Sequence, residues 1–342
     1  MLSRFKSAAR VLLKGDPKKK KRNPIPAITP KQVAEIKQFF PREKFFIFGH
    51  ARSGTTLLMR LVRLHPEVHC NYQAHFFTRP PLLKSLVDTP EAEEWLSRRS
   101  NRWNQGQDLS PLVLRAAADF IMERDGAKEG KMIVGDKSPS STIHGQAVRD
   151  LHSVYPDAKL VYIVRDGRDV LVSERFRNLV EESKFLKAED KGMMEELRKD
   201  QTLFTNGTRS IFTETVIRRV ARGWVINVQE TEDEGKRLFG ENYFSLRYED
   251  MLRYPFEELA RLWGFLGVKE IDGSLEKLIK VGMESNPDGE WQTKRDEGIA
   301  SFLPKGHAGN WKRLFTARDK SIFKEVAGEM LIKWNYEKDL NW

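Results

Sequence analysis

One segment combines residue types that can hold an anion. It reads Gly-His-Ala-Arg-Ser-Gly-Thr-Thr from Gly49 to Thr56 and follows the apolar run Phe45 to Phe48. A strand that ends at glycine and enters a helix at paired threonines forms a concavity of backbone N–H groups. The helix dipole also favours a negative charge there. The segment therefore predicts a phosphate cradle, with a plain Gly-rich strand-to-helix turn as the alternative.

The cation of this loop differs from that of nucleotide triphosphatases. Their loops end in Gly-Lys-[Ser/Thr], where the lysine reaches the terminal phosphates and the hydroxyl holds magnesium. Here Thr55 follows Gly54, and the loop's cation is Arg52. An arginine at this place can reach the bridging oxygen of a phosphosulfate. We therefore expect a phosphosulfate ligand and no metal.

A second group of basic and hydroxyl residues follows another apolar run, Leu160 to Val164. It extends from Arg165 to Ser173, in the order Arg-Asp-Gly-Arg-Asp-Val-Leu-Val-Ser. If a helix begins directly after the strand, Ser173 and Arg177 lie one turn apart on a common face. Together with Arg165 they predict a second phosphate site. For each arginine alone, a surface ion pair is the alternative.

A third segment, Pro304 to Lys312, is rich in small residues and reads Pro-Lys-Gly-His-Ala-Gly-Asn-Trp-Lys. Small residues let the backbone close over a ligand, although Gly and Lys are also common in surface loops. Just beyond it, Thr316 and Asp319 form a capping-box pattern that predicts the start of a helix.

The elements that position these segments predict an α/β fold. Helical patterns such as Thr55 to Leu64 alternate with short apolar runs that suit buried strands. Such alternation implies a single domain with a mostly parallel central sheet flanked by helices, and ligands gather at the carboxyl ends of the strands. The runs are 45–48, 68–71, 132–134, 160–164 and 243–246. Residues 180–210 contain a charged, weakly periodic stretch that we interpret as a surface helix and loop and as a candidate lid.

Residues 1–30 form a basic tail and a Pro-rich linker, and the domain covers residues 31–342. Through Arg22 there are nine Lys and Arg against one Asp, a net of +8 out of the +10 of the whole chain. Residues 1–14 have an amphipathic helical pattern, which predicts contact of residues 1–22 with an anionic membrane surface, a nuclear-localisation-like address or a solvated terminus. The nearly neutral body argues against nucleic acid as a partner.

The remaining composition favours a soluble protein of the cytoplasm. The chain has 342 residues, 39% of them hydrophobic, so it can bury a sizeable core. Cys70 is the single cysteine, and no intrachain disulfide can form. No apolar stretch reaches the roughly 18 to 20 residues of a membrane span, and the start lacks a signal-peptide core. Membrane contact would therefore be peripheral.

The three segments together resemble the nucleotide-dependent sulfotransferase family. The resemblance implies a P-loop-like sulfotransferase fold that transfers a sulfuryl group from 3′-phosphoadenosine 5′-phosphosulfate (PAPS) to a hydroxyl or amine. Residues 49–68 are most similar to the branch of tyrosylprotein and bacterial enzymes. Lys305-Gly306, with Gly309 to Lys312, is more similar to the cytosolic branch.

The resemblance implies three groups of donor-binding residues. The 5′-phosphosulfate would be held by Arg52, Ser53, Gly54, Thr55 and Thr56, and the 3′-phosphate by Arg165, Ser173 and Arg177. The rest of the nucleotide would lie near Tyr248 and be closed over by Lys305 and Gly306. Lys137 matches a lysine beside the transferring group, where with Arg52 it would neutralise developing charge. An exposed loop lysine is the alternative.

Some positions depart from the family pattern. Leu57 stands where cytosolic enzymes have a tryptophan that packs on adenine, and Pro304 replaces an arginine. Gln73 falls where the tyrosylprotein branch has its catalytic glutamate, and an amide is no base at neutral pH. A histidine suits the task because its pKa lies near working pH. His75 and His144 are the candidates, and Asp136 is a third.

The acceptor stays open among peptide, glycan, lipid and small phenol. Trp95, Trp103 and the pair Phe76-Phe77 would either line an apolar acceptor site or pack in the core. Two other functions compete with sulfuryl transfer. One is a nucleotide kinase-like enzyme with a degenerate phosphate loop, and the other is a nucleotide-binding or membrane-docking protein that lost its base.

Overall fold

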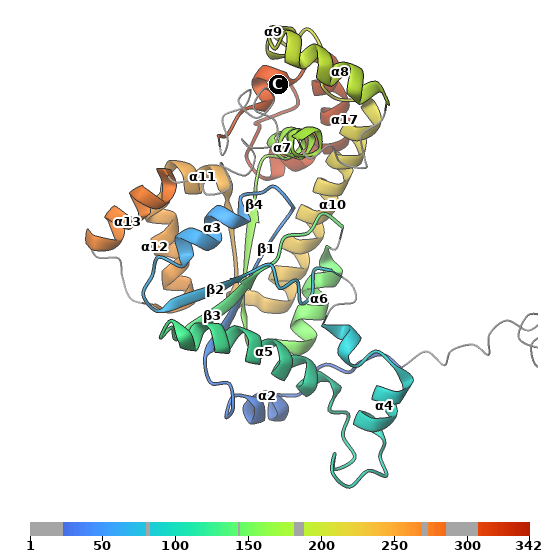
Figure 1. Ribbon diagram of the computed structural model, residues 1–342, viewed down its shortest axis with the longest axis vertical. Coiled ribbons are helices and arrows are strands. Elements are labelled where there is room, and N and C mark those ends of the chain that lie inside the picture. The colour runs from blue at the N-terminus through green and yellow to red at the C-terminus, as the bar shows by residue number, and fades with distance from the viewer. Residues whose placement is uncertain (1–22, 80–82, 143, 181–187, 269–272, 285–306) are drawn as a thin grey trace, which may run out of the picture.

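The computed structural model describes residues 23–79, 83–142, 144–180, 188–268, 273–284 and 307–342 (Figure 1). Its centre is one five-stranded sheet in the order β2-β3-β1-β4-β5, and every neighbouring pair of strands is parallel. The strands are β1 Glu43–Gly49, β2 Val68–Tyr72, β3 Ile133–Lys137, β4 Lys159–Val164 and β5 Tyr243–Arg247. The predicted α/β fold with a mostly parallel central sheet is confirmed.

Strand β1 lies in the middle of the sheet and is buried on both faces. The rings of Phe46 and Phe48 pack into one hydrophobic cluster, and Phe45 and Ile47 pack into a second cluster on the opposite face. A strand covered on both sides needs apolar residues at every position, which explains its unbroken apolar run.

Helices cover both faces of the sheet (Figure 1). Beside Ile47 lie α3 Thr55–Val62, α11 Tyr248–Arg253, α12 Pro255–Leu266 and α13 Gly273–Glu284. Beside Phe46 lie α5 Ser110–Lys128, α6 Gly145–Val154, α7 Gly167–Val180, α10 Glu214–Phe239 and α17 Ala317–Lys333. The capping box of Thr316 and Asp319 opens α17, as the sequence predicts.

Smaller elements complete the described chain. They are α2 Pro30–Ile36, α4 Pro90–Ser97, α8 Ala188–Lys199, α9 Thr202–Thr205, α16 Trp311–Leu314 and the short 3₁₀ turns Lys84–Leu86 and Gly240–Asn242. Helices α8 and α9 fall in the stretch expected to form a surface helix and loop, while residues 181–187 lie outside the described residues.

Several element boundaries, including the ends of α3 and β3, differ from the prediction by one to three residues. Helix α3 ends at Val62, two residues before Leu64, and Arg63 is its C-cap. Strand β3 runs on through Asp136 and Lys137, beyond the apolar run that predicted it. Both polar side chains are buried. Hydrophobic patterning therefore cannot mark this end of the strand.

The topology creates a crevice at the carboxyl ends of β1 and β4. Helix α3 leaves β1 toward one face of the sheet, whereas α7 leaves the neighbouring β4 toward the other face. Such a change of direction between adjacent strands opens a ligand crevice in parallel sheets. The loops after β1 and β4 are the two predicted phosphate sites.

The described chain begins against the body of the domain. Asn23 donates two hydrogen bonds to the Glu93 carboxylate of α4, from N at 3.2 Å and from Nδ2 at 2.6 Å. Ile28 N donates to Ser153 O at 2.8 Å, and Thr29 forms a capping box at the start of α2. Residues 1–22 lie outside the described residues. Among the helices that are described, none has the length and apolar content that a membrane crossing requires.

Candidate active site

The loop after β1 has the backbone of an anion cradle. Arg52 and Gly54 both have left-handed backbones, with φ of 74° and 87°, and Ser53 N donates to His50 O at 3.1 Å. The loop then enters α3 at Thr55, whose N-cap Gly54 supplies no side-chain hydrogen bond. The first N–H groups of α3 are thus left for a ligand, as a phosphate or sulfate site requires.

Two buried polar atoms also suit a donor nucleotide. Ser53 Oγ is buried and has no hydrogen-bond partner among the described residues, and the same is true of Arg165 Nε. Buried polar groups are normally paired. Unpaired donors beside an uncapped helix therefore fit the predicted anion, so the residues present match PAPS on structural grounds.

The two predicted phosphate sites meet through their side chains. Arg52 Nε donates to Ser173 Oγ at 3.1 Å, and Arg165 Nη1 donates to Arg52 O at 3.1 Å. Arg52 and Ser173 are half-buried and Arg165 is buried. Arg177 lies one turn beyond Ser173 on α7, with an exposed side chain.

Tyr248 closes the side of the cradle. The Arg165 guanidinium lies 4.7 Å from the centre of the Tyr248 ring. A Cβ atom placed on Gly54 would come within 2.2 Å of Cδ2 of the same ring. Only glycine fits at this position, both because of its backbone and because of the neighbouring ring. Tyr248 therefore lies beside the loop that would hold the nucleotide.

The segment after the predicted closing residues is fixed by an aspartate that the sequence reading missed. Asp169 accepts hydrogen bonds from Gly309 N at 2.6 Å and Trp311 N at 3.1 Å. Arg165 Nη2 donates to His307 O at 3.0 Å. Asp169 lies four residues before Ser173, so helical spacing alone places both on one face of α7. Lys305 and Gly306 lie outside the described residues.

Lys137 brings a positive charge to the other side of the loop. Its Nζ donates to Thr56 Oγ1 at 3.2 Å and lies 3.9 Å from the centre of the Tyr72 ring. Its side chain is buried, so the alternative of an exposed loop lysine is wrong. Tyr72 is a contact that sequence reasoning missed, and an aromatic residue at the end of β2 was its only signal.

Residues 73–75 are held tightly against the end of β3. Gln73 N donates to Lys137 O at 2.9 Å, and His75 N donates to Ser138 Oγ at 2.8 Å. Gln73 and His75 both have positive φ, 59° and 55°. Non-glycine residues in this region store strain, which is typical of functional loops. His75 is thereby placed next to the segment that carries Lys137.

The His75 ring is neutral at physiological pH. Burial, together with the nearby charges of Arg79 and Lys137, lowers its pKa to about 4. Nδ1 lies 2.8 Å from Thr78 Oγ1. Nε2 is buried without a hydrogen-bond partner among the described residues. A neutral imidazole with an unpaired nitrogen can accept a proton from a bound acceptor.

Asp136 is already engaged in holding this segment. Its carboxylate accepts from Ala74 N at 2.8 Å and from Ser138 Oγ. Burial raises its pKa to about 6, and these hydrogen bonds oppose that rise. The carboxylate thus positions His75 through Ser138, and we interpret it as a positioning residue.

His144 lines a small cavity near Ser138. This cavity, of about 10 Å³, is lined by His144, Thr78, Ser138 and six other residues. His144 is half-buried at the N-cap of α6, where burial lowers its pKa. Its Nδ1 lies 3.2 Å from Asn227 Nδ2. The structure therefore brings both histidine candidates near Ser138, with His75 next to the Lys137 strand end.

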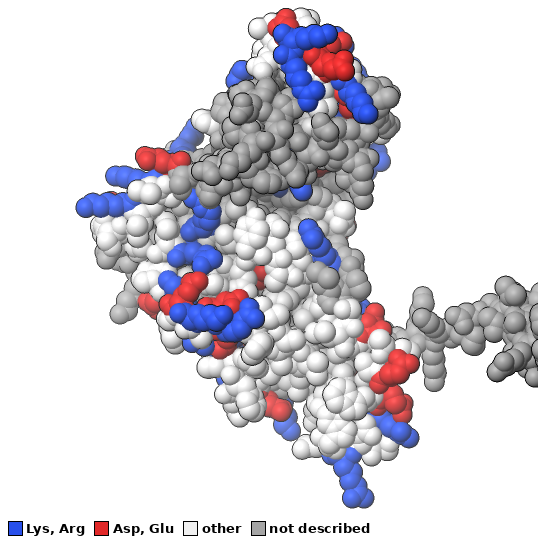
Figure 2. Space-filling view, in the orientation of Figure 1, with Lys and Arg blue, Asp and Glu red and all other residues white. Residues whose placement is uncertain are grey.

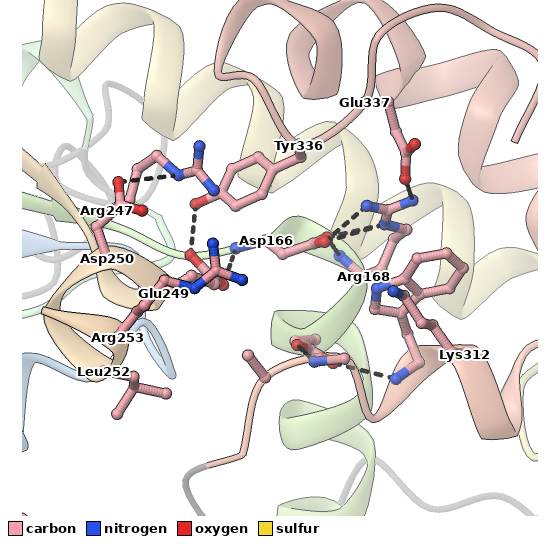
Figure 3. A pocket seen from close by; sticks show the side chains of 14 residues that line it. Asp166, Arg168, Arg247, Glu249, Asp250, Leu252, Arg253, Lys312, Tyr336 and Glu337 are labelled. Carbon is pink, nitrogen blue, oxygen red and sulfur yellow. Dashed lines mark hydrogen bonds and ion pairs between the residues drawn. The ribbon is translucent and has the colours of Figure 1, made fainter.

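A larger pocket of about 650 Å³ lies beside the β4–α7 turn (Figure 3). Glu249 lies in it, accepting hydrogen bonds from Asp166 N at 3.0 Å and Tyr336 Oη at 2.9 Å. Burial raises the Glu249 pKa to about 7. Arg168 stacks on Trp311, with its guanidinium 3.7 Å from the ring centre. Acidic and basic side chains are mixed in this pocket, unlike in the cationic cradle.

The predicted acceptor aromatics divide into two groups. Phe76 and Phe77 are buried in the core cluster, as one of the two alternatives predicts. Trp95 and Trp103 are 62% and 51% exposed, so core packing is wrong for them. Trp95 lies on α4, and Trp103 lies on the loop that follows it.

Known proteins resemble this chain over most of its length. A model of the sulfotransferase family matches residues 44–272. Protein-tyrosine sulfotransferase A of Caenorhabditis elegans is 24% identical over 70% of this chain and 53% of its own. Human sulfotransferase 1C2 is 27% identical over 50% of this chain and 53% of its own. The chain thus spans about half the length of these curated relatives.

Solved structures were also compared. Mouse sulfotransferase SULT7A1 complexed with PAP has a TM-score of 0.47 and 17% identity, covering 89% of this chain and 90% of that one. The sulfotransferase domain from the curacin biosynthetic pathway has a TM-score of 0.49 and 15% identity, covering 84% and 97%. The family assignment itself rests on the sequence match, which includes the loops after β1 and β4. The chain belongs to the sulfotransferase family.

Proposed function

We propose that this protein transfers a sulfuryl group from PAPS to a hydroxyl or amine. One observation carries the proposal: two anion sites on neighbouring strands meet through the Arg52–Ser173 contact of 3.1 Å. The site formed by Arg165 and Ser173, after β4, suits a 3′-phosphate. Residues 52–56, after β1, suit the 5′-phosphosulfate. A donor with two anionic ends matches this pair of sites. Names and activities of the relatives agree with the proposal.

Charge stabilisation would drive the transfer. The acceptor oxygen forms a bond to sulfur while the bond from sulfur to the bridging phosphate oxygen breaks, and that oxygen keeps the electron pair. Arg52 would neutralise the leaving phosphate, and Lys137 would stabilise the equatorial oxygens of the sulfuryl group. Loss of one such contact costs on the order of 10²- to 10³-fold in rate, roughly 2.7 to 4 kcal/mol. These side chains supply the charges without a metal.

His75 is the proposed base that takes the acceptor's proton. Its unpaired Nε2 and its hydrogen-bonded backbone beside Lys137 support this role. Its pKa of about 4 keeps it unprotonated at working pH. His144 is the alternative base, because it lines a small cavity together with Ser138, the residue whose Oγ accepts a hydrogen bond from His75 N.

The test is transfer of labelled sulfate from PAPS. The purified protein is incubated with donor, without added metal and with a chelator, against tyrosine peptides, glycans, phenols and lipids. We expect transfer to at least one acceptor, unchanged by chelator and reduced on the order of 10²-fold or more in Arg52→Ala. Magnesium-dependent ATP turnover without sulfate transfer would contradict the proposal and favour the kinase-like reading.

A non-catalytic function is the second candidate, because Gln73 stands where the tyrosylprotein branch has its base. It makes a different prediction in the same assay. The product 3′-phosphoadenosine 5′-phosphate (PAP) would bind and raise the melting temperature, but no acceptor would become labelled. PAP binding that is lost in Arg165→Ala, together with no sulfate transfer by wild type, would therefore support the non-catalytic function.

Residues 1–22 are proposed to touch an anionic membrane surface from the cytoplasm. Their nine Lys and Arg against one Asp support this contact, since each basic residue near an anionic leaflet adds about 1 kcal/mol. The single cysteine, Cys70, is buried and unpaired, which suits a reducing compartment. Residues 23–342 carry a net charge of only +2, which argues against nucleic acid as a partner.

A further inference from the structure

Tyr72 is an exposed aromatic residue beside the proposed transfer site. It is the last residue of β2, and it is 56% exposed. Among the described strands, β2 is an edge strand that pairs with β3 alone. A single exposed ring is common on protein surfaces. The contact of this ring with Lys137 distinguishes it from the others.

The register of the sheet places Tyr72 next to Lys137. Tyr72 pairs with Lys137 across β2 and β3, and Lys137 pairs with Ile47 across β3 and β1. Paired residues of parallel strands point to the same face of the sheet. Ile47 packs in the cluster on the α3 side. The three residues therefore form a row on that face, which leads from the edge of the sheet toward the loop after β1.

The Lys137 ammonium contacts both this ring and the anion loop. Its Nζ lies 3.9 Å from the centre of the Tyr72 ring and 3.2 Å from Thr56 Oγ1. The lysine is completely buried, with an exposed fraction of 0%. A lysine side chain is a flexible stem whose ammonium can otherwise take many positions. Contacts from two different elements, β2 and α3, restrict it to a position beside Thr56.

An aromatic ring holds an ammonium in a different way from a carboxylate. The negative face of the ring attracts the cation but carries no net charge, so the charge of Lys137 stays available to a ligand. The neighbouring acid, Asp136, pairs with Phe46 and so lies on the opposite face of β3. There its carboxylate accepts from Ala74 N and Ser138 Oγ.

The surroundings of the central strands also favour an uncharged partner. Charged side chains gather at the borders of this face of the molecule, and the surface over the central strands is largely uncharged (Figure 2). The backbone after Tyr72 is bonded to that of Lys137 as well, because Gln73 N donates to Lys137 O at 2.9 Å. Ring and ammonium therefore belong to two segments that are hydrogen-bonded to each other.

We propose that Tyr72 is a positioning residue, which holds the Lys137 ammonium where it meets the sulfuryl group of PAPS. The inference rests on the proposed function, since it requires a donor whose sulfuryl oxygens lie beside Lys137. It adds a residue that lies outside the three segments proposed to bind the donor. Tyr72 would act through Lys137 rather than on the reacting atoms.

Binding of PAPS and PAP tests this role without any acceptor. PAPS carries the sulfuryl group and PAP lacks it, so the ratio of the PAP Kd to the PAPS Kd reports contacts to that group. Tyr72→Leu should lower this ratio about fivefold and leave the PAP Kd unchanged. Tyr72→Phe keeps the aromatic face and should retain the wild-type ratio. Titration calorimetry with the full chain measures both constants.

A double-mutant cycle with Lys137→Met separates positioning from direct contact. Lys137→Met alone should lower the ratio about tenfold or more. Adding Tyr72→Leu to Lys137→Met should then change the ratio by less than about twofold, because the ring acts through the ammonium. In the transfer assay, Tyr72→Leu should lower kcat about fivefold and leave the acceptor KM unchanged.

Phe120→Leu is the matched control. Phe120 has the same exposed fraction as Tyr72, 56%, and lies on α5, outside the segments proposed to bind the donor. This variant should keep both dissociation constants, kcat and the melting temperature of wild type.

Three results would overturn the positioning role. A wild-type ratio in Tyr72→Leu would show that Lys137 needs no ring. Equal effects of Tyr72→Leu with and without Lys137, or a higher acceptor KM at unchanged kcat, would show that the ring contacts a ligand directly. Loss of PAP affinity together with a lower melting temperature would assign the ring to the stability of the fold. Failure of wild type to bind either nucleotide would instead overturn the proposed function itself.

Discussion

At the scale of single residues, the proposed chemistry has two parts, which are stabilisation of negative charge and acceptance of a proton. Arg52 and Lys137 reach the cradle from opposite sides, one bonded to Ser173 and the other to Thr56. In the proposed mechanism, proton acceptance falls to His75, a buried histidine whose backbone N donates to Ser138 Oγ. Because Lys137 also lowers the pKa of that histidine, charge stabilisation and proton transfer are electrostatically coupled.

The pH dependence of the rate distinguishes the candidate bases. If His75 is the base, kcat/KM should rise with pH around 4 and then stay level, because the group is neutral above its pKa. If Asp136 were the base, the rise should be centred near 6. The measurement is a pH–rate profile of wild type, His75→Gln, His144→Gln and Asp136→Asn.

His75→Gln should lower kcat on the order of 10²-fold while leaving PAP affinity unchanged. His144→Gln is the matched control and should retain the wild-type profile. The reverse pattern would assign the base to His144. A profile that loses its rise only in Asp136→Asn would instead make the carboxylate the base.

At the scale of elements, the cradle depends on contact between the loop and α11. Tyr248, the first residue of α11, lies where a Cβ on Gly54 would come within 2.2 Å. The Arg165 guanidinium packs on the same ring. Loop and helix therefore determine each other's position, and the donor site is as much a product of packing as of sequence motif.

Gly54→Ala should lower both PAP affinity and melting temperature. The left-handed backbone of Gly54 costs an alanine about 1 kcal/mol, and displacement of Tyr248 adds to this. Gly130→Ala is the matched control, since Gly130 also has positive φ, 67°, but has no atom within 4 Å of the added Cβ. Calorimetric PAP titration and thermal unfolding would measure both effects. Equal losses in the two variants would show that the ring contact is unimportant.

The two loops proposed to bind the donor could be located from sequence because each loop directly follows a short apolar strand. The run before Gly49 and the run before Arg165 are local signals, and parallel topology brings their ends together. The position of His75, on the β2–β3 side of the site, was harder to predict. The place of His75 depends on positive φ at two non-glycine residues, and no composition signal marks such strain. Likewise, the loop that carries Trp103 is joined to α4 by hydrogen bonds of Asn104 to Leu96 O and Arg98 O, which no sequence pattern marks.

At the scale of the whole molecule, a buried carboxyl joins the C-terminal segment to the sheet. Glu249 accepts from Tyr336 Oη after α17 and from Asp166 N at the end of β4. Burial raises its pKa from 4.5 to about 7. Between these values the folded protein binds more protons at this group than the unfolded chain does. Its contribution to stability is full below pH 4.5 and falls as pH rises to 7.

Glu249→Gln should remove this pH dependence. We expect the free energy of unfolding of wild type, relative to the variant, to fall by up to about 3 kcal/mol between pH 4.5 and 7. Urea unfolding of both proteins across this range provides the measurement. Tyr336→Phe keeps the titrating carboxyl and should therefore still lose stability with rising pH. A constant difference between wild type and Glu249→Gln would show that the carboxyl does not titrate in this window.

The order of the strands has a consequence for how such an enzyme can diversify. Strand β1 separates the flank proposed to bind the nucleotide, β4 and β5, from the flank of Lys137 and His75, β3 and β2. In the proposed mechanism, the loop after β1 lies between the two flanks. Substitutions along residues 65–79 should therefore alter which acceptor is modified while leaving PAP affinity unchanged. In evolutionary terms, we expect the β4–β5 side to stay constant while the β3–β2 side varies. A new acceptor would then require substitutions on only one side of β1.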